Sequence, residues 1–204
     1  MTEKVQLPYY EKELARTEIT DTTEYKQSVV ELLSDDRIIE AAKSGHLTLA
    51  MIRPFVGPDA NLQGLSDAEC ADLIEEMIEG LGVAGKFSFR FTEDVVGEFY
   101  EGAPQEVMEK NPPLDATRFD SRWPEFKEFM SSGTTTALLL YAKDGDAIER
   151  WRAHLGHWNI DKYRDPATIR GALGVNLYNN LVHGSDAPES VVRELGLIRS
   201  VVES

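Results

Sequence analysis

A single histidine stands between a predicted strand and a predicted helix near the end of the chain, and this placement constrains both the fold and the chemistry. Residues 175–182 carry apolar side chains in a pattern typical of an extended segment, which His183 and Gly184 end. The segment Asp186–Glu189 then predicts a helix, with Asp186 as its cap, a proline in the first turn and a glutamate that completes a capping box. His183 is therefore expected beside a helix N-terminus, where unpaired N–H groups and the helix dipole favour a phosphate.

The composition limits the class of protein and the ligands that it can bind. The chain has 204 residues, of which 42% are hydrophobic, and this supports one well-cored domain. Its apolar runs fall well short of the roughly 20 residues that a membrane helix needs, and no targeting segment is visible, so we expect a cytoplasmic protein. The net charge of −15 argues against binding to nucleic acids or anionic membranes, although a local basic pocket would still hold a small phosphorylated ligand.

Hydrophobic periodicity divides the chain into an N-terminal extension, residues 1–45, and a domain, residues 46–204. The extension is partly helical, and one helix is predicted from Thr22 or Thr23 to Lys43 because the apolar residues there form a single stripe. In the domain strands alternate with helices, which predicts an α/β or α+β fold with helices covering a four-stranded sheet. The predicted strands cover residues 47–52, 86–91, 134–142 and 175–182, and the main predicted helices cover residues 65–81, 124–130, 144–155, 166–173 and the segment after 186.

Three arginines near the ends of predicted elements are candidates for binding phosphate groups. Arg53 follows the first strand, Arg152 lies on the helix before Gly156, and Arg170 precedes the strand that leads to the histidine. A guanidinium group matches phosphate oxygens with two parallel hydrogen bonds, so three of them that converged would hold the phosphates of a nucleotide. Each one taken alone is better explained as a solvated surface residue.

His183 is the strongest candidate for a nucleophile. A neutral imidazole attacks phosphorus when an acceptor holds its other ring nitrogen, and Glu194, two turns along the following helix, or a backbone carbonyl would supply that acceptor. The alternative is a histidine that only packs at a strand end and a glutamate that is solvated. The remaining histidines and Cys70, the single cysteine, show no metal-binding spacing.

Several motifs together resemble the nucleoside diphosphate kinases. The segment Asn180–Asp186, followed by Glu189 and Glu194, is similar to the active-site signature of that family. The resemblance runs from about Leu47 to Ile198 with its elements in order. Further similar segments are Leu49–Pro54, Phe99–Tyr100, Phe129–Gly133 and Thr168–Gly171.

This resemblance implies a ferredoxin-like α/β sandwich with a four-stranded antiparallel sheet covered by helices. It also implies ping-pong transfer of the γ-phosphate of a nucleoside triphosphate to a nucleoside diphosphate, through a phosphohistidine at His183 and with Mg²⁺ held mainly by the nucleotide. A homo-oligomer is implied as well, with its size left open. By position, the catalytic residues would be His183, Glu194, Arg53 and Tyr100, and the nucleotide-binding residues would be Arg53, Trp123, Arg152, Trp158, Arg170, Asn180 and Ser185.

The chain departs from the family pattern at two positions of the expected site. Arg53 stands where the family has a lysine near the transferred phosphate, and Trp158 stands where it usually has a threonine. The chain also has an N-terminal extension and a short C-terminus. These departures leave two alternatives open: a catalytically weak nucleotide-binding or regulatory protein, and a relay or scaffold in which phosphorylated His183 passes its phosphate to another protein.

Overall fold

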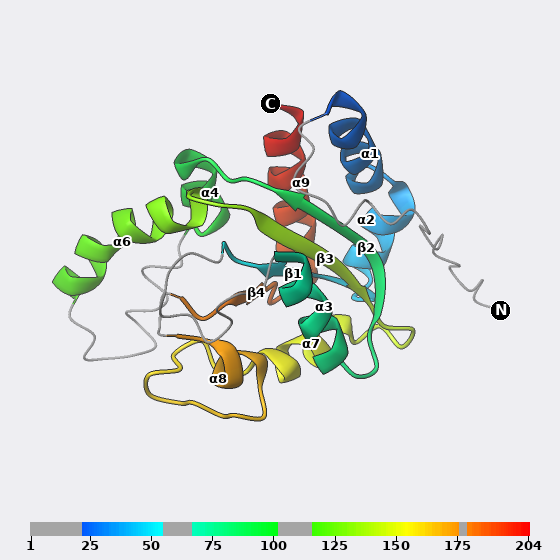
Figure 1. The fold of residues 1–204 in the computed structure, drawn as a ribbon. Helices are drawn as coiled ribbons and strands as arrows, with labels where there is room; N and C mark the ends of the chain where they lie inside the picture. Colours follow the sequence, from blue (N-terminus) through cyan, green and yellow to red (C-terminus); the bar gives the residue numbers. More distant parts are fainter. Residues whose placement is uncertain (1–21, 55–66, 102–115, 176–178) are drawn as a thin grey trace.

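The computed structural model of the chain describes residues 22–54, 67–101, 116–175 and 179–204, and a four-stranded sheet lies at its centre (Figure 1). The strand order is β2-β3-β1-β4, and every neighbouring pair is antiparallel. The predicted four-stranded antiparallel sheet of an α+β fold is therefore confirmed. The strands are β1 (Leu47–Ile52), β2 (Gly82–Phe89), β3 (Thr135–Tyr141) and β4 (Val182–Gly184).

Helices cover both faces of this sheet, and Figure 1 shows α9 with α1 and α2 beside one face and α3, α7 and α8 beside the other. Of the described segments, none forms a helix that is both long and apolar enough to cross a lipid bilayer. The helices are α1 (Thr23–Leu33), α2 (Asp36–Lys43), α3 (Asp67–Met77), α4 (Glu93–Phe99), α6 (Ala116–Ser131), α7 (Ala147–Leu155), α8 (Ile169–Leu173) and α9 (Pro188–Glu203).

β1 is buried along its whole length because it lies inside the sheet with a hydrophobic layer on each face. Side chains alternate between the faces of a strand, so Leu49 and Met51 join the layer under α9 while Ala50 and Ile52 join the layer under α7. This burial explains why all residues of the strand except Thr48 are apolar.

The N-terminal segment forms two helices where the sequence predicts one. α1 ends at Leu33, and the side chain of Asp35 accepts a hydrogen bond from the backbone N–H of Arg37 at the start of α2. Aspartate at this position accepts a hydrogen bond from a free N–H at the start of a new helix. This local bond favours two separate helices over one continuous helix. The division at residue 45 stays a prediction, although both helices pack on the sheet domain through buried Val29, Leu32 and Ile38.

Two other boundaries also differ from the predicted ones. β2 begins at Gly82, four residues before the predicted start, and a bulge between Val83 and Gly85 interrupts its alternation. α6 begins at Ala116, well before the predicted start, and contains Pro124 within its length. The glycines and the bulge interrupt the alternation of apolar and polar residues by which a strand such as β2 is recognised in a sequence. Proline in a sequence usually indicates a helix boundary, which is why the predicted helix begins at Pro124.

Candidate functional site

β4 presents His183 from an edge of the sheet. His183 is opposite Met51 of β1, so its side chain points to the face that α9 covers. The indole N–H of buried Trp151 on α7 donates to the carbonyl oxygen of His183 at 3.2 Å. This bond holds the backbone of the edge strand β4 against α7. A β-carbon at Gly184 would lie 2.4 Å from Nε1 of Trp151, so only glycine permits this close approach.

The strand that carries the histidine is shorter than predicted. Leu181 has a φ of 71°, in the left-handed region that an extended chain does not visit, and regular pairing begins only at Val182. The backbone N–H of Val182 instead donates back to the carbonyl of Asn180 at 2.9 Å. The predicted strand over 175–182 is therefore wrong at Val175 and at residues 179–181, and the strand instead continues from Val182 through His183 to Gly184. Residues 176–178 of the prediction lie outside the described part of the chain.

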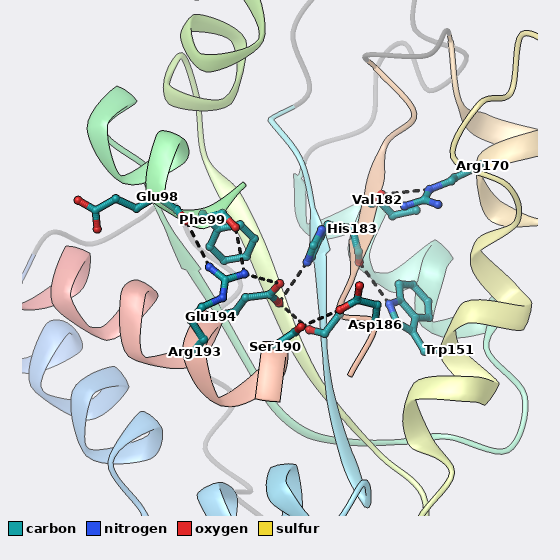
Figure 2. Close-up of polar contacts among 11 residues, drawn as sticks. Glu98, Phe99, Trp151, Arg170, Val182, His183, Asp186, Ser190, Arg193 and Glu194 are labelled. Carbon is teal, nitrogen blue, oxygen red and sulfur yellow. Dashed lines mark hydrogen bonds and ion pairs between the residues drawn. The ribbon is translucent and has the colours of Figure 1, made fainter. Parts of the chain in front are cut away.

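Glu194 reaches back from α9 to the histidine, and Figure 2 shows the two side chains pointing toward one another. Its Oε2 lies 3.2 Å from Nε2 of His183 and also accepts a hydrogen bond from the hydroxyl of buried Ser185 at 2.6 Å. An ionised carboxylate only accepts, so the ring proton belongs on Nε2 and the lone pair on Nδ1. The arrangement leaves His183 with a nucleophilic nitrogen, Nδ1.

Two aromatic rings flank the imidazole. Phe99 and Tyr100, at the end of α4, meet the ring of His183 in edge-on geometry with centroid distances of 5.2 and 5.5 Å. Burial raises the pKa of Tyr100, and the positive charge of Arg53 opposes that rise. The phenol is therefore neutral at physiological pH and lies beside the histidine as a polar but uncharged neighbour.

The helix after the histidine begins one residue later than predicted. Ala187 is its cap residue and has no side-chain bond to the helix, while Pro188 occupies the first turn as predicted. Asp186 instead accepts a hydrogen bond from the hydroxyl of Ser190 at 2.7 Å. That bond is the largest cause of a lowered pKa at Asp186, and the charge of Arg152 also contributes. The predicted capping role of Asp186 is therefore wrong.

Arg170, Arg53 and Arg152 lie close enough for their charges to interact. Burial, followed by repulsion from Arg53 and Arg152, lowers the pKa of Arg170 to about 9. Its guanidinium donates to the carbonyl oxygen of Val182 through Nε and Nη2, and to that of Gly156 through Nη1. Three mutually repelling cations beside a potential nucleophile favour the binding of an anion.

Arg53 takes part in contacts that the sequence does not predict. Nη1 donates to Oδ1 of Asn180 at 2.7 Å, and the guanidinium carbon lies 5.8 Å from the ring centre of Tyr100 and 5.4 Å from that of Phe126. The amide of Asn180 in turn donates to the carbonyl oxygen of Trp158 at 3.0 Å. Arg53 and Trp158, the two departures from the family pattern, are thus joined through one asparagine.

The two predicted tryptophans occupy different parts of the site. Trp123 stacks on Phe126 at 5.4 Å with 20° between the ring planes, which places it next to the aromatic ring under Arg53. Trp158 contributes its backbone to Asn180, and its ring stacks on His157 at 5.7 Å. Arg152 is exposed on α7, and its charge reaches both Arg170 and Asp186.

Four residues that shape this site, Phe99, Phe126, Trp151 and Arg193, have no role predicted from the sequence, although Phe99 belongs to the similar segment Phe99–Tyr100. Their apolar or charged character fits ordinary helix positions, and only their contacts across the fold distinguish them. In the described part of the chain, His, Cys, Asp and Glu form no group of three or more able to hold a metal ion. The local charges are mainly cationic, and Glu194 is occupied by His183 and Ser185.

Comparison with known proteins gives matches along most of the chain. A family model described as nucleoside diphosphate kinase matches residues 46–201. A nucleoside diphosphate kinase of Syntrophotalea carbinolica is 36% identical over 151 residues, which are 73% of this chain and 91% of that protein. The crystal structure of the Aquifex aeolicus nucleoside diphosphate kinase aligns with a TM-score of 0.53 and 31% identity, covering 75% of this chain and 94% of that one. A Halobacterium salinarum nucleoside diphosphate kinase in complex with CDP aligns with a TM-score of 0.50 and 26% identity, covering 74% and 85%.

Proposed function

The chain belongs to the nucleoside diphosphate kinase family, and from that premise we propose that it transfers the γ-phosphate of a nucleoside triphosphate to a nucleoside diphosphate through a phosphohistidine at His183. Family membership makes the chain a phosphotransferase that acts on nucleotides. The observation that carries the proposed mechanism is the bond between Nε2 of His183 and Glu194, because it leaves Nδ1 as the nucleophile.

The proposed reaction has two displacements at phosphorus. In the first, the lone pair of Nδ1 attacks the γ-phosphorus, the bond to the bridging oxygen breaks, and the nucleoside diphosphate leaves with that electron pair. In the second, a terminal oxygen of another nucleoside diphosphate attacks the phosphorus and the N–P bond breaks. Glu194 keeps the ring oriented and stabilises the positive charge that it gains, in the way that a carboxylate supports a histidine in other catalytic sites.

Arg53, Arg152 and Arg170 are proposed to bind the phosphates of the nucleotide. Burial, and after it repulsion from Arg53 and Arg152, lowers the pKa of Arg170, and the negative charge of a phosphate chain would offset that repulsion. Positively charged donors placed around a transferring phosphoryl group also stabilise its transition state. Tyr100 would present its neutral hydroxyl to the same region.

The remaining predicted residues are proposed to hold the nucleoside. Trp123 offers an aromatic face for a base, and Asn180 is proposed to bond the sugar while it holds Arg53 and the backbone of Trp158. The Halobacterium salinarum relative was solved with CDP, which supports a nucleoside diphosphate as the ligand. Ser185 supports the site through Glu194.

Magnesium is proposed to enter with the nucleotide. Among the described residues around His183 are several arginines, and the carboxylate of Glu194, which bonds that ring, already accepts from His183 and Ser185. Such a donor set does not fit a protein-bound Mg²⁺, which prefers oxygen ligands in near-octahedral geometry. The phosphate oxygens of a nucleotide supply those ligands. Assembly into a homo-oligomer stays a prediction.

A catalytically weak nucleotide-binding protein is the second candidate, and one observation favours it. Nη1 of Arg53 is committed to Asn180, and three N–H groups of Arg170 are directed at backbone carbonyls. These donors would have to be shared or redirected when phosphates bind. This reading and the kinase reading differ in whether His183 becomes phosphorylated.

The test is incubation of the purified protein with γ-labelled ATP and Mg²⁺, followed by acid treatment of the labelled protein and a chase with GDP. We expect acid-labile label on the wild type, its discharge to GTP, and no label on His183→Ala. His46→Ala, a histidine before β1 and outside the site, is the matched control and should label normally. A wild type that binds nucleotide but takes no label would establish the weak-binding reading, and a labelled His183→Ala would exclude His183 as the nucleophile.

A further inference from the structure

Arg193 connects α9 to the end of α4, and sequence reasoning gave it no role. Its Nη1 donates to the carbonyl oxygen of Glu98 and its Nη2 to that of Phe99, each at 3.2 Å (Figure 2). These are the last two residues of α4, where carbonyls lack the regular partner four residues on, and the carbonyl oxygen of Glu98 also accepts from the backbone N–H of Glu101 at 3.3 Å. A cation at the C-terminus of a helix is also favoured by the helix dipole.

The same guanidinium lies beside the carboxylate that orients the histidine. Nη2 of Arg193 is 3.6 Å from Oε1 of Glu194, while the other oxygen of that carboxylate takes His183 and Ser185. The two oxygens of Glu194 are thus divided between a cation on one side and the imidazole on the other. With one oxygen held by each side, the carboxylate cannot rotate freely about its bond to the side chain. The direction in which Oε2 accepts the hydrogen bond from Nε2 of His183 is therefore fixed.

α4 provides the second side of the histidine's surroundings. Phe99 and the following residue, Tyr100, place their ring edges against His183, and the guanidinium carbon of Arg193 lies 6.0 Å from the ring centre of Phe99. Arg193 therefore contacts the two structures that hold the imidazole: the carboxylate behind Nε2 and the turn that carries the flanking rings.

We propose that Arg193 is a positioning residue for phosphoryl transfer, which sets the geometry of His183 by tying Glu194 to the C-terminus of α4. This inference rests on the proposed function, in which His183 accepts the phosphate. Arg193 touches neither the imidazole nor, in the proposed reaction, the nucleotide. It therefore acts on the orientation of the imidazole ring, which determines the direction of Nδ1 relative to the γ-phosphorus.

A neighbouring arginine on the same helix provides a matched comparison. The side chain of Arg199 is 44% exposed and that of Arg193 is 47% exposed, so the two are similarly accessible to solvent. Arg199, however, pairs with Glu203 at 3.7 Å and with the hydroxyl of Ser34 at 3.4 Å, away from β4. Substitution of Arg199 removes one exposed cation from α9 and leaves the contacts of Glu194 and α4 intact.

The experiment compares wild type, Arg193→Gln, Arg193→Lys and Arg199→Gln in single-turnover labelling with γ-labelled ATP and Mg²⁺. For Arg193→Gln we expect the rate of label formation at saturating ATP to fall about 10- to 100-fold, because small displacements of a reacting group cost rate steeply. The ATP concentration for half-maximal rate should change less than about twofold, because Arg193 adds no binding energy in the ground state. Arg193→Lys should recover part of the rate, and Arg199→Gln should match wild type.

A second measurement keeps this inference apart from the proposed function. NMR of the ring nitrogens of His183 reports its tautomer without any turnover, and we expect the proton on Nε2 in wild type and a mixture of tautomers in Arg193→Gln. A wild type that takes no label would refute the proposed function, and the tautomer comparison would still decide whether Arg193 holds the ring. Wild-type label formation together with an unchanged rate and an unchanged tautomer in Arg193→Gln would overturn the inference. If Arg193→Gln fails to fold, the rate of Arg193→Lys decides the matter: a partial loss supports the inference, because one ammonium group cannot keep the contacts with Glu98, Phe99 and Glu194 together, and a full wild-type rate overturns it.

Discussion

The hydroxyl oxygen of Ser185 lies 2.6 Å from Oε2 of Glu194, the carboxylate oxygen that also faces the imidazole of His183. Both partners are almost fully buried, so this hydrogen bond replaces water that the carboxylate has lost. Ser185 follows directly after β4 and Glu194 lies on α9, so the bond ties the strand that carries the histidine to the helix that orients it.

Ser185→Ala removes a donor from this buried carboxylate. We expect the free energy of unfolding to fall by about 1.5–3 kcal/mol, the range for hydrogen bonds to charged groups, as measured by urea denaturation. The rate of phosphoenzyme formation should also fall, because Glu194 loses the contact that fixes Oε2 toward the ring. Ser200→Ala, at a more exposed position of α9, should change stability by less than about 0.5 kcal/mol. Equal stability of Ser185→Ala and wild type would show that the bond contributes nothing.

Arg53→Lys tests whether the site is built around the arginine. Lysine keeps the charge but loses the planar group that bonds Asn180 and lies over the rings of Tyr100 and Phe126. We therefore expect phosphoenzyme formation to slow by about tenfold, equivalent to roughly 1.4 kcal/mol of transition-state stabilisation. Arg37→Lys, an exposed position on α2, is the control. Unchanged or faster labelling of Arg53→Lys would mean that the site works at least as well with lysine, and that it is not built around the arginine.

Parts of the fold follow from the sequence because burial leaves a simple pattern. β1 and β3 are buried on both faces, and their mostly apolar sequences predict them almost to the residue. β2 is harder to recognise, since it lies at an edge and its first half contains two glycines and a bulge. The break between α1 and α2 depends on one local bond at Asp35, which competes with a helical pattern that the apolar stripe favours.

The site was predictable where one local element positions its residues, and not where distant segments meet. Glu194 lies two turns along the helix that follows His183, so helical geometry alone brings it within reach. Arg53 and Asn180 are 127 positions apart, and no periodicity reveals that they bond to each other. The same holds for Trp151 and Arg193, whose importance comes from backbone carbonyls on other elements.

Nucleotide binding should depend on pH through Arg170. The lowered pKa of about 9 means that the guanidinium loses its proton within an accessible range, mainly because it is buried and also because Arg53 and Arg152 repel it. We expect the affinity for ADP to weaken as the pH rises from 8 to 10, and protons to be taken up on binding near pH 9 because the phosphates favour the charged form. Calorimetry in buffers of different ionisation enthalpy measures both effects.

Arg53→Gln tests whether repulsion from Arg53 contributes to the lowered pKa of Arg170. Removal of one repelling charge raises the pKa of Arg170, so the decline in ADP affinity should begin at higher pH, whatever the affinity at pH 8. An affinity that stays constant from pH 8 to 10 in wild type would contradict the lowered pKa of Arg170.

The N-terminal helices should stabilise the domain through an edge of its sheet. The hydroxyl of Tyr25 on α1 donates to the carbonyl oxygen of Ser88 at 3.0 Å and accepts from its backbone N–H at 2.8 Å. Ser88 belongs to β2, an outer strand of the sheet, so one phenol satisfies two backbone groups that would otherwise face outward. We expect Tyr25→Phe to lower the free energy of unfolding by about 1–3 kcal/mol at pH 8 and to speed hydrogen exchange at Ser88.

The contribution of Tyr25 should disappear at high pH. Burial raises the pKa of its phenol, and the hydrogen bond with Ser88 only partly opposes this. Below pH 10 the phenol is neutral in both states, and above it the unfolded chain loses the proton first, so the free energy of unfolding falls as pH rises through the folded-state pKa. Urea denaturation at pH 8 and above pH 10 should therefore show wild type and Tyr25→Phe converging. Tyr163→Phe, at a tyrosine that is 48% exposed, should follow wild type at both pH values. If the difference between Tyr25→Phe and wild type is already zero at pH 8, the phenol does not anchor α1 to the sheet.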